Sequence, residues 1–498
     1  MIKNSQIALG LTLLFCSHSL LADDLLDIYQ SSLKNDPAWA ARESNYLADR
    51  EQEVQTKSLL RPTVGIVYSK SRSQRTGPDI GAGLSEALRD EVANCFTDLS
   101  GAATGTVSED CSGNLVGFIA DPSNEAFALT ETGSSKQKTT ADNFSLRFTQ
   151  PLFNLENWYL NRGAKSLASR GDAEFAFAEQ QFIVDVAETY FNVLKAAEEL
   201  HFAKTEQSAI GQQLAQTKEG VEVGLIQITD VHEAQGAYDL SQTGVIVAEG
   251  LLLSAQEQLA TLTNRDQFNL ATLAEDFPIA APQPSGPDAW VKMAQKNNKS
   301  LLAMRHAVRA SLHKITERSA AYAPKVDFFA TFDNLKTDNG DDSPVGTSGN
   351  LGSDVNSQTL GLQINIPLYS GGLTSSRVRE AKHRHAASRA QQEVQSRRTA
   401  ALAKNLYRKV NNGVRKIEVI RITIDSNQNA LEATQAGYAT GTRNVFDVLQ
   451  AQRTLFSAKR DYANARYDYL IDSLKLKQVG GILEAVDLRL LNEWLDPA

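Results

Sequence analysis

The chain has 498 residues, of which 42% are hydrophobic and 22% are charged, and its net charge at pH 7 is −9. The hydrophobic share is too large for a disordered chain, and the acidic balance argues against nucleic acid as the main partner. Only three cysteines are present. Their number excludes a disulfide-based scaffold and a zinc cluster built on cysteine.

Residues 1–22 are predicted to be a secretory signal peptide. Lys3 supplies the positive start, residues 7–15 are apolar, and Ala22 precedes the expected cleavage site. Cys16 follows Phe15, which is too large for lipoprotein processing. No later segment is apolar and long enough for a transmembrane helix, so we expect a periplasmic, extracellular or outer-membrane β-barrel protein.

All 13 prolines lie outside two long stretches, residues 152–277 and 368–496. Because proline is excluded from helix interiors, two stretches of nearly equal length predict two copies of one long helical unit. Residues 150–153 (Gln-Pro-Leu-Phe) also match residues 366–369 (Ile-Pro-Leu-Tyr). We therefore predict an internal duplication, with a first repeat at 23–277, a proline-rich linker at 278–287 and a second repeat at 288–498.

Each repeat is predicted to hold two β-strands followed by long helices. The strands are expected at about 62–71 and 142–151, around a long outward loop at 72–141, and at about 324–335 and 357–368. The helices are expected at 155–265 and 373–477. Alternating apolar and polar residues over about ten positions suit a membrane barrel with a wet lumen. A soluble sheet with one buried face is the alternative for any single strand.

Four strands cannot close a barrel, because an open sheet edge carries backbone groups that lipid cannot satisfy. The smallest bacterial barrels have about eight strands. The chain is therefore expected to oligomerise.

Several motifs resemble the TolC family of outer-membrane efflux proteins, and the resemblance covers essentially the whole mature chain. The motifs are residues 187–194 (Ala-Glu-Thr-Tyr-Phe-Asn-Val-Leu), 228–231 (Ile-Thr-Asp-Val), 366–372, 436–443, 447–449 and 463–467. The missing lipoprotein signal sets the chain apart from the lipidated drug-efflux branch.

The resemblance implies an α+β membrane protein in the outer membrane of a Gram-negative cell. Three chains of four strands each would form a 12-stranded barrel that continues into a long periplasmic coiled-coil barrel. The implied function is an exit duct for drugs, small toxic molecules or secreted polypeptides. The implied partners are a periplasmic adaptor, an inner-membrane pump of the RND, ABC or MFS class, and outer-membrane lipid.

The resemblance also implies a polar latch that closes the inner end of the duct. Tyr438 and Arg443 of the second repeat would bond Thr229 and Asp230 of the first. A few charge-assisted hydrogen bonds of about 1.5–3 kcal/mol each form a latch that docking can release. Alternatively, residues 441–443 only cap a helix, and Asp230 favours a helix N-terminus through the helix dipole.

The family further implies rings of aspartates at the entrance, two per chain and one helical turn apart. Asp447 supplies the first, but Gln450 occupies the second position. We hypothesise that Glu233, three residues after Asp230 in the other repeat, replaces the missing acid. The alternative is that Glu233 is a solvated surface residue. Rings of this kind favour cations.

The outward loop of the first repeat is the longer one, with 89 positions from Pro62 to Pro151 against 43 from Pro324 to Pro367. It contains Cys95 and Cys111, which are expected to form a disulfide in an oxidising compartment.

Two rival functions remain at this stage. A periplasmic coiled-coil scaffold or adaptor without a pore would explain the helices but not the strands. An enzyme is disfavoured, because the sequence offers no catalytic residue set, no metal site and no cofactor motif.

Overall fold

The computed structural model describes residues 23–84, 90, 127–224, 227–341 and 353–496. The chain forms two compact units: a helical unit of residues 1–57, 155–322 and 368–498, and a strand unit of residues 58–154 and 323–367. The predicted signal peptide, Cys95 and Cys111 lie outside the described residues. None of the described helices combines the length and the apolar character needed to cross a membrane.

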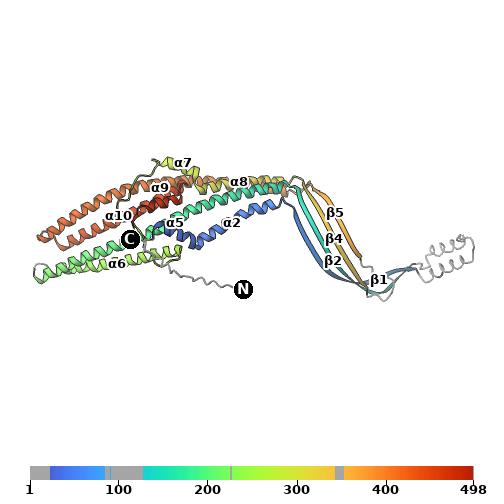
Figure 1. Cartoon of the computed structure of the whole chain (residues 1–498), viewed down its shortest axis with the longest axis horizontal. Helices are drawn as coiled ribbons and strands as arrows, with labels where there is room; N and C mark the ends of the chain where they lie inside the picture. Colours follow the sequence, from blue (N-terminus) through green and yellow to red (C-terminus); the bar gives the residue numbers. More distant parts are fainter. Residues whose placement is uncertain (1–22, 85–89, 91–126, 225–226, 342–352, 497–498) are drawn as a thin grey trace, which may run out of the picture. The chain divides into compact units, whose positions relative to one another are not determined.

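The strand unit is one antiparallel sheet of four long strands (Figure 1). The strands are β1 (Thr63–Leu84), β2 (Phe127–Phe153), β4 (Lys325–Asp341) and β5 (Ser353–Asn365). Their order is β1-β2-β4-β5, so within the described residues β1 and β5 each pair on one side only. The two outer edges of the sheet come from different halves of the sequence.

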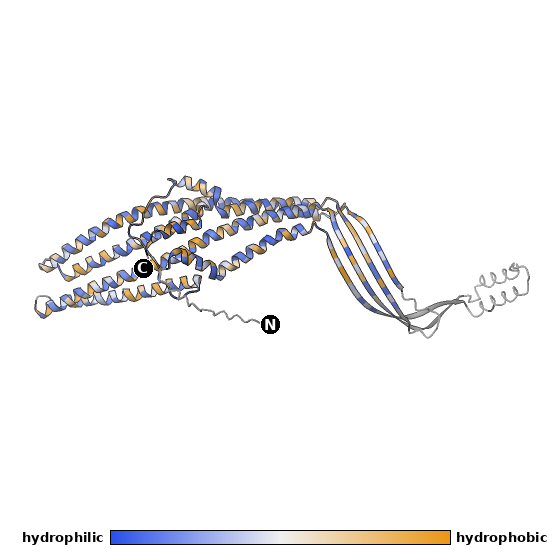
Figure 2. Cartoon of the chain, viewed as in Figure 1, coloured by the Kyte–Doolittle hydropathy of each residue, from blue (hydrophilic) through white to orange (hydrophobic). Residues whose placement is uncertain are grey.

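The strand register places apolar side chains on one face of the sheet. One row across the four strands reads Val64, Phe148, Ala330 and Leu360. Directly opposed residues share a face, and successive residues alternate between faces. Figure 2 shows this alternation along the strands. Val64, Ile66 and Leu360 are 68%, 66% and 74% exposed, so this face is uncovered in the single chain.

The opposite face is mainly polar. Ser145, Arg147 and Thr331 lie on it, together with Phe329, which is an aromatic exception. Phe329 pairs with Gly361 across the β4–β5 ladder. A Cβ atom at Gly361 would lie 2.9 Å from the Phe329 Cζ atom, so the glycine makes room for the ring.

Two strand boundaries differ from the prediction, because β1 and β2 are longer than expected. The predicted loop at 72–141 instead continues β1 to Leu84 and begins β2 at Phe127. The apolar alternation stops near Tyr68, but the ladder continues through polar pairs such as Arg72 with Thr140. Ladder hydrogen bonds join backbone groups, so the side-chain pattern does not mark where they end.

In the second repeat, β4 extends to Asp341 and β5 ends at Asn365, before Pro367. The predicted strand at 357–368 is therefore too long at its end. Proline has no backbone N–H to donate to a ladder, which is consistent with pairing that stops ahead of it.

The helical unit contains two successions of elements with nearly equal lengths. The first is α2 (Pro37–Ser58, 22 residues), α5 (Leu155–Glu222, 68 residues) and α6 (Ile228–Thr263, 36 residues). The second is α8 (Lys299–Ala320, 22 residues), α9 (Leu373–Ala439, 67 residues) and α10 (Val445–Gly480, 36 residues). In both successions the two strands follow the 22-residue helix.

The main core joins the middle of α5 to α10. Its largest fully buried side chains include Tyr190, Phe191 and Tyr467. The Tyr467 hydroxyl donates to Glu198 at 2.6 Å, and the Tyr190 hydroxyl donates to the Ala271 carbonyl at 2.7 Å. Burial raises the pKa of both phenols well above the usual range, so both remain donors at physiological pH.

Short elements surround this core. They are α1 (Leu25–Asn35), β3 (Thr272–Leu273), α7 (Pro287–Asn297), α11 (Ala485–Asn492) and β6 (Leu495–Asp496). Asp23 anchors the start of the described chain, because its carboxylate accepts two hydrogen bonds from Arg265 at 2.9 and 3.0 Å. Leu25 and Ile28 of α1 are fully buried in the core.

Phe191→Ala should destabilise the helical unit by about 3–5 kcal/mol, because it leaves a cavity in a close-packed core. Tyr190→Phe is the matched control in the same cluster, and the loss of its hydrogen bond should cost only about 1 kcal/mol. Chemical denaturation followed by circular dichroism measures both. Equal effects of the two substitutions would contradict this assignment of the core.

Acid should weaken the contact between α5 and α8. Burial and the nearby Arg309 lower the pKa of both His306 and His313. A histidine with a lowered pKa binds fewer protons in the folded state, so its contribution to stability is lost as the pH falls below about 6.5. The melting temperature should fall less on acidification in the His306→Gln, His313→Gln variant than in the wild type. An identical fall in both proteins would show that other groups are responsible.

Candidate functional site

The candidate site lies at the two turns that end the longest helices. Between α9 and α10, Gly441 adopts a positive φ of 72°, a conformation that glycine takes without strain. The Gly437 carbonyl accepts hydrogen bonds from the Thr442 and Arg443 backbone amides at 2.9 and 3.2 Å. The Thr442 hydroxyl donates to the same carbonyl at 3.0 Å. These bonds satisfy a backbone carbonyl group at the C-terminal end of α9. Residues 441–443 therefore have the capping role that was considered above.

α10 begins with a reciprocal cap formed by Asn444 and Asp447. The Asp447 amide donates to Asn444 Oδ1 at 2.9 Å, and the Asn444 amide donates back to Asp447 Oδ2 at 3.5 Å. The same carboxylate lies 3.7 Å from the Arg443 guanidinium. Asp447 therefore serves the helix cap and an ion pair within one chain.

Arg443 folds back over Gly437. A Cβ atom at residue 437 would lie only 2.8 Å from the Arg443 Cγ atom. The absence of a side chain at this position thus sets the place of the arginine. The Arg443 side chain remains 60% exposed, so its guanidinium can still reach another partner.

Tyr438, in the last turn of α9, packs against apolar side chains. It contacts two apolar clusters, one of Ile210, Leu214, Ala234, Ala237, Val445 and Leu449 and one of Leu431, Val448 and Leu455. Its hydroxyl is buried and has no hydrogen-bond partner among the described residues. A buried polar group without a partner costs about 1–3 kcal/mol, so this hydroxyl favours any state that supplies one.

The turn between α5 and α6 carries the other predicted residues. Gly224 has a positive φ of 78°, and residues 225–226 are not described. Gln227 precedes α6 without a side-chain cap. Thr229 is exposed and Asp230 is half-buried in the first turn of α6, where a carboxylate is favoured by the helix dipole. Glu233 is exposed one turn further on.

In the single chain, the four predicted latch residues do not bond with one another across the two turns. Among the residues that the structure describes, no hydrogen bond or ion pair links Tyr438 or Arg443 to Thr229 or Asp230. Arg443 pairs with Asp447 instead. Asp447 and Glu233 lie near the start of α10 and of α6 respectively.

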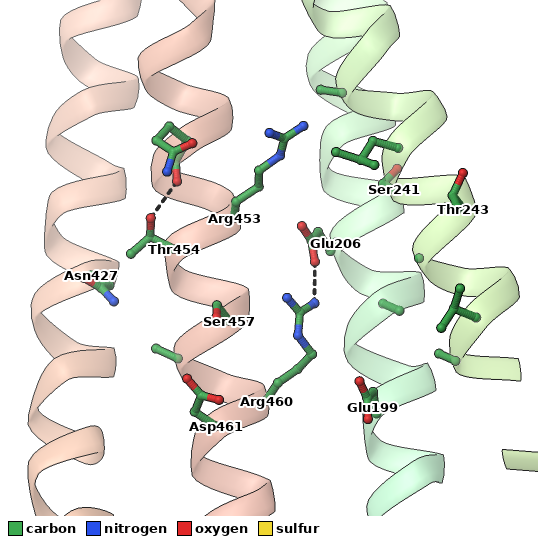
Figure 3. Close-up of a pocket in the computed structure, with 18 of the residues that line it drawn as sticks. Glu199, Glu206, Ser241, Thr243, Asn427, Arg453, Thr454, Ser457, Arg460 and Asp461 are labelled. Atoms are coloured by element: carbon green, nitrogen blue, oxygen red, sulfur yellow. Dashed lines mark hydrogen bonds and ion pairs between the residues drawn. The ribbon is translucent and has the colours of Figure 1, made fainter. Parts of the chain in front are cut away.

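A cleft of about 830 Å³ lies between the α5–α6 pair and the α9–α10 pair. Gln450 and Asp461 line it, together with Ser241 and Thr243 of α6. Figure 3 shows Arg460 of α10 reaching toward Glu206 of α5, with 2.6 Å between their nitrogen and oxygen atoms. The sequence interpretation missed this bridge, because a charge at one helical position does not reveal a partner 254 residues away.

The region offers reversible polar contacts between helices. Within the described ranges, no group of three or more His, Cys, Asp or Glu residues is placed to hold a metal ion. The arrangement consists of two helix pairs, a cleft between them and polar side chains at their tips. Its chemistry is the making and breaking of hydrogen bonds and ion pairs between helices.

Gly437→Ala should displace Arg443 and strain the turn by about 1–3 kcal/mol, because the new methyl group overpacks the site. Gly236→Ala is the control, since a Cβ atom there meets nothing within 4 Å. That control should be neutral or stabilising by about 0.5–1 kcal/mol, because alanine is the better helix former. Thermal unfolding of the two variants measures the difference. Similar stabilities would contradict the placement of Arg443 over Gly437.

The chain is similar to known outer-membrane proteins. The family model described as "Outer membrane efflux protein" matches residues 28–265 and 290–481. The outer membrane protein TolC of Vibrio cholerae is 32% identical over 353 residues, which cover 71% of this chain and 80% of that protein. The alkaline protease secretion protein AprF of Pseudomonas aeruginosa is 25% identical over 486 residues, which cover 97% of this chain and 89% of AprF.

A solved structure of CusC, whose description refers to transmembrane channel formation, shares the fold. It superposes with a TM-score of 0.69 at 15% sequence identity, and the match covers 92% of each chain.

Proposed function

The chain belongs to the outer membrane efflux protein family, and from this premise we propose that three copies form an exit duct across the outer membrane and the periplasm. It is an outer-membrane channel protein for efflux or secretion and not an enzyme, in keeping with its relatives. The trimeric assembly, the latch and the partner proteins are the proposed parts of this account.

The strand unit carries the proposal of a trimer. Within the described residues, its sheet has edges at β1 and β5 that pair with no other strand, and an uncovered apolar face. In lipid, backbone groups at an open edge cannot remain unpaired. Pairing β5 of each chain with β1 of the next closes a 12-stranded barrel, turns the apolar face to lipid and encloses the polar face. A scaffold without a pore leaves the uncovered apolar face unexplained.

The helical unit supplies the proposed periplasmic tunnel. Helices of 68 and 67 residues are about 100 Å long at about 1.5 Å per residue. The equal element lengths of the two successions support an internal duplication, which gives a ring of three chains a pseudo-sixfold wall. An adaptor protein and an inner-membrane pump of the RND, ABC or MFS class would engage the inner end and deliver drugs, toxic molecules or polypeptides.

Two further proposals concern maturation of the chain. Cleavage after Ala22 would make Asp23 the first residue, and its backbone nitrogen already donates to the Asn269 carbonyl at 2.6 Å. A free amino group can make the same bond. Cys95 and Cys111 are proposed to form a disulfide in the outward loop.

The latch is proposed to form when Tyr438 and Arg443 engage Thr229 and Asp230, within a chain or between neighbours. The buried Tyr438 hydroxyl has no partner within the described residues, and the Arg443 guanidinium has a long contact with Asp447 at 3.7 Å. Both groups therefore have bonding capacity left for the carboxylate of Asp230. A few such bonds hold the inner end closed and are weak enough for partner docking to release.

Single-channel conductance tests the duct and the latch together. The wild type should show a small, stable conductance in planar bilayers, and the Tyr438→Phe, Arg443→Ser variant a several-fold larger one, because two polar contacts are lost. Tyr238→Phe with Arg421→Ser is the control, since it removes the same groups outside the proposed latch. An unchanged conductance in the latch variant would contradict the latch assignment and leave the proposal of a pore intact. No conductance from folded, inserted protein would favour the scaffold.

The proposed entrance ring consists of Asp447 and Glu233, with Gln450 in place of an acid. A trivalent cation should block the channel, and Asp447→Asn should weaken the block at least about tenfold by removing a charge. The side-chain oxygen that this substitution retains can still accept the Asn444 amide, so the helix cap survives. Glu233→Gln should weaken the block as well, and Gln450→Glu should strengthen it. Unchanged block in Glu233→Gln would exclude Glu233 from the ring.

A further inference from the structure

A second pocket lies in the middle of the helical unit, where the short helix α1 meets α5. Its volume is about 430 Å³, which is within the range of about 300–1,000 Å³ that small-molecule sites occupy. Segments far apart in the sequence line it: Tyr29 and Leu33 of α1, Trp39 of α2, Glu179, Gln180 and Ile183 of α5, Lys299 of α8, and Leu483 in the turn before α11. All of them belong to the helical unit, so the pocket is a feature of one compact body.

Polar groups on the wall of this pocket are not used by the rest of the described chain. The Tyr29 hydroxyl, the Glu179 carboxylate and the Lys299 ammonium group make no hydrogen bond or ion pair within the described residues. Gln180 is only 5% exposed, and its amide nitrogen donates to the Leu483 carbonyl at 2.9 Å. The amide oxygen of Gln180 has no partner among the described residues. A buried acceptor of this kind favours any state that supplies a donor.

The two charges of the pocket have opposite signs and come from different helices. Burial raises the pKa of the Glu179 carboxyl group, and the positive charge of Lys299 opposes this rise. The two groups therefore act on each other electrostatically without forming an ion pair. Burial also raises the pKa of the Tyr29 hydroxyl, and the charge of Glu179 adds to the rise, so the phenol remains a hydrogen-bond donor at physiological pH.

An apolar surface adjoins these polar groups. Trp39 and Ile183 are 8% and 4% exposed, and both line the pocket. The Trp39 ring is held by two aromatic neighbours, with centroid distances of 4.9 Å to Phe182 and 5.3 Å to Phe175. A fixed apolar surface of this kind can receive an apolar group of a ligand without losing side-chain freedom of its own.

The arrangement calls for a ligand with three parts. A positive group would meet the Glu179 carboxylate and the Gln180 amide oxygen, and a negative group would meet the Lys299 ammonium group and the Tyr29 hydroxyl. An apolar group would cover the surface of Trp39. A free α-amino acid with an apolar side chain has all three parts, because both its amino and carboxyl groups are ionised at neutral pH. A simple amine or a simple carboxylate satisfies only one of the two charges.

We propose that this pocket binds a free α-amino acid with an apolar side chain, with its ammonium group on Glu179 and its carboxylate on Lys299. Charge-assisted hydrogen bonds at both ends fix the orientation of the ligand. The bound molecule links α1 and the turn before α11 to α5 and α8. The site contains none of the residues of the proposed latch or entrance ring, so it is independent of the proposed duct.

Three related ligands test the site on the wild-type protein. L-leucine should bind to the full chain in detergent, as measured by isothermal titration calorimetry. Leucinamide lacks the carboxylate and isocaproate lacks the amino group, so each should bind at least about tenfold more weakly, measured by competition with L-leucine. The proposal is overturned if L-leucine does not bind at about 10 mM, or if the three ligands bind equally.

Two substitutions assign the ends of the ligand. Lys299→Met should weaken L-leucine binding at least about tenfold and leave the affinity for leucinamide unchanged, because leucinamide has no carboxylate. Glu179→Gln should weaken L-leucine binding to a similar extent and leave the affinity for isocaproate unchanged. Lys296→Met is the matched control, since Lys296 is exposed and does not line the pocket, and it should bind L-leucine as the wild type does.

The pattern of losses decides the outcome. Selective losses in Lys299→Met and Glu179→Gln support the proposal, and no loss in either variant, or an equal loss for all ligands, overturns it. Neither side chain has an internal ion pair to lose, so both variants should fold, which circular dichroism checks. If one variant does not fold, the comparison of the three ligands on the wild type still decides for or against the site.

Discussion

In the proposed duct, the rest of the assembly depends on the two sheet edges that stay unpaired within the described residues. A strand in lipid must place its backbone groups in hydrogen bonds, because no water is available to replace them. β1 and β5 meet this requirement on one side each within the described residues. In the proposed barrel, the uncovered apolar face, with Val64 and Leu360 largely exposed, has the same cause, because such a wall is complete only when lipid covers it. Family membership places the chain in the membrane where such a wall is needed.

The helical unit combines a close-packed core with reversible polar contacts. Its core is dense where α5 meets α10, around Tyr190, Phe191 and Tyr467. Toward the turns, polar links such as Glu206 with Arg460 at 2.6 Å border a cleft between the helix pairs. Polar contacts of this kind are reversible, whereas a close-packed core is not easily opened. The distribution of packing is therefore suited to movement at the turns and rigidity in the middle.

Much of the fold could be predicted from the sequence, because proline placement and period-two alternation are local signals. The excluded prolines indicated the long helices, and the alternation of apolar and polar residues indicated the strands. The strand ends could not be predicted, since polar pairs such as Arg72 with Thr140 extend a ladder without an apolar pattern.

The candidate site was predictable in part. Asn444 and Asp447 form a capping pair that is visible in sequence, yet Asp447 was interpreted only as an entrance acid. The buried hydroxyl of Tyr438 and the Glu206–Arg460 bridge depend on contacts between distant segments, which a single sequence does not reveal.

The most direct measurement is electron cryomicroscopy of the assembly in lipid nanodiscs. The account predicts a closed ring of three chains with β5 of each hydrogen-bonded to β1 of the next. A different number of chains, or β1 and β5 edges that do not meet, would contradict it.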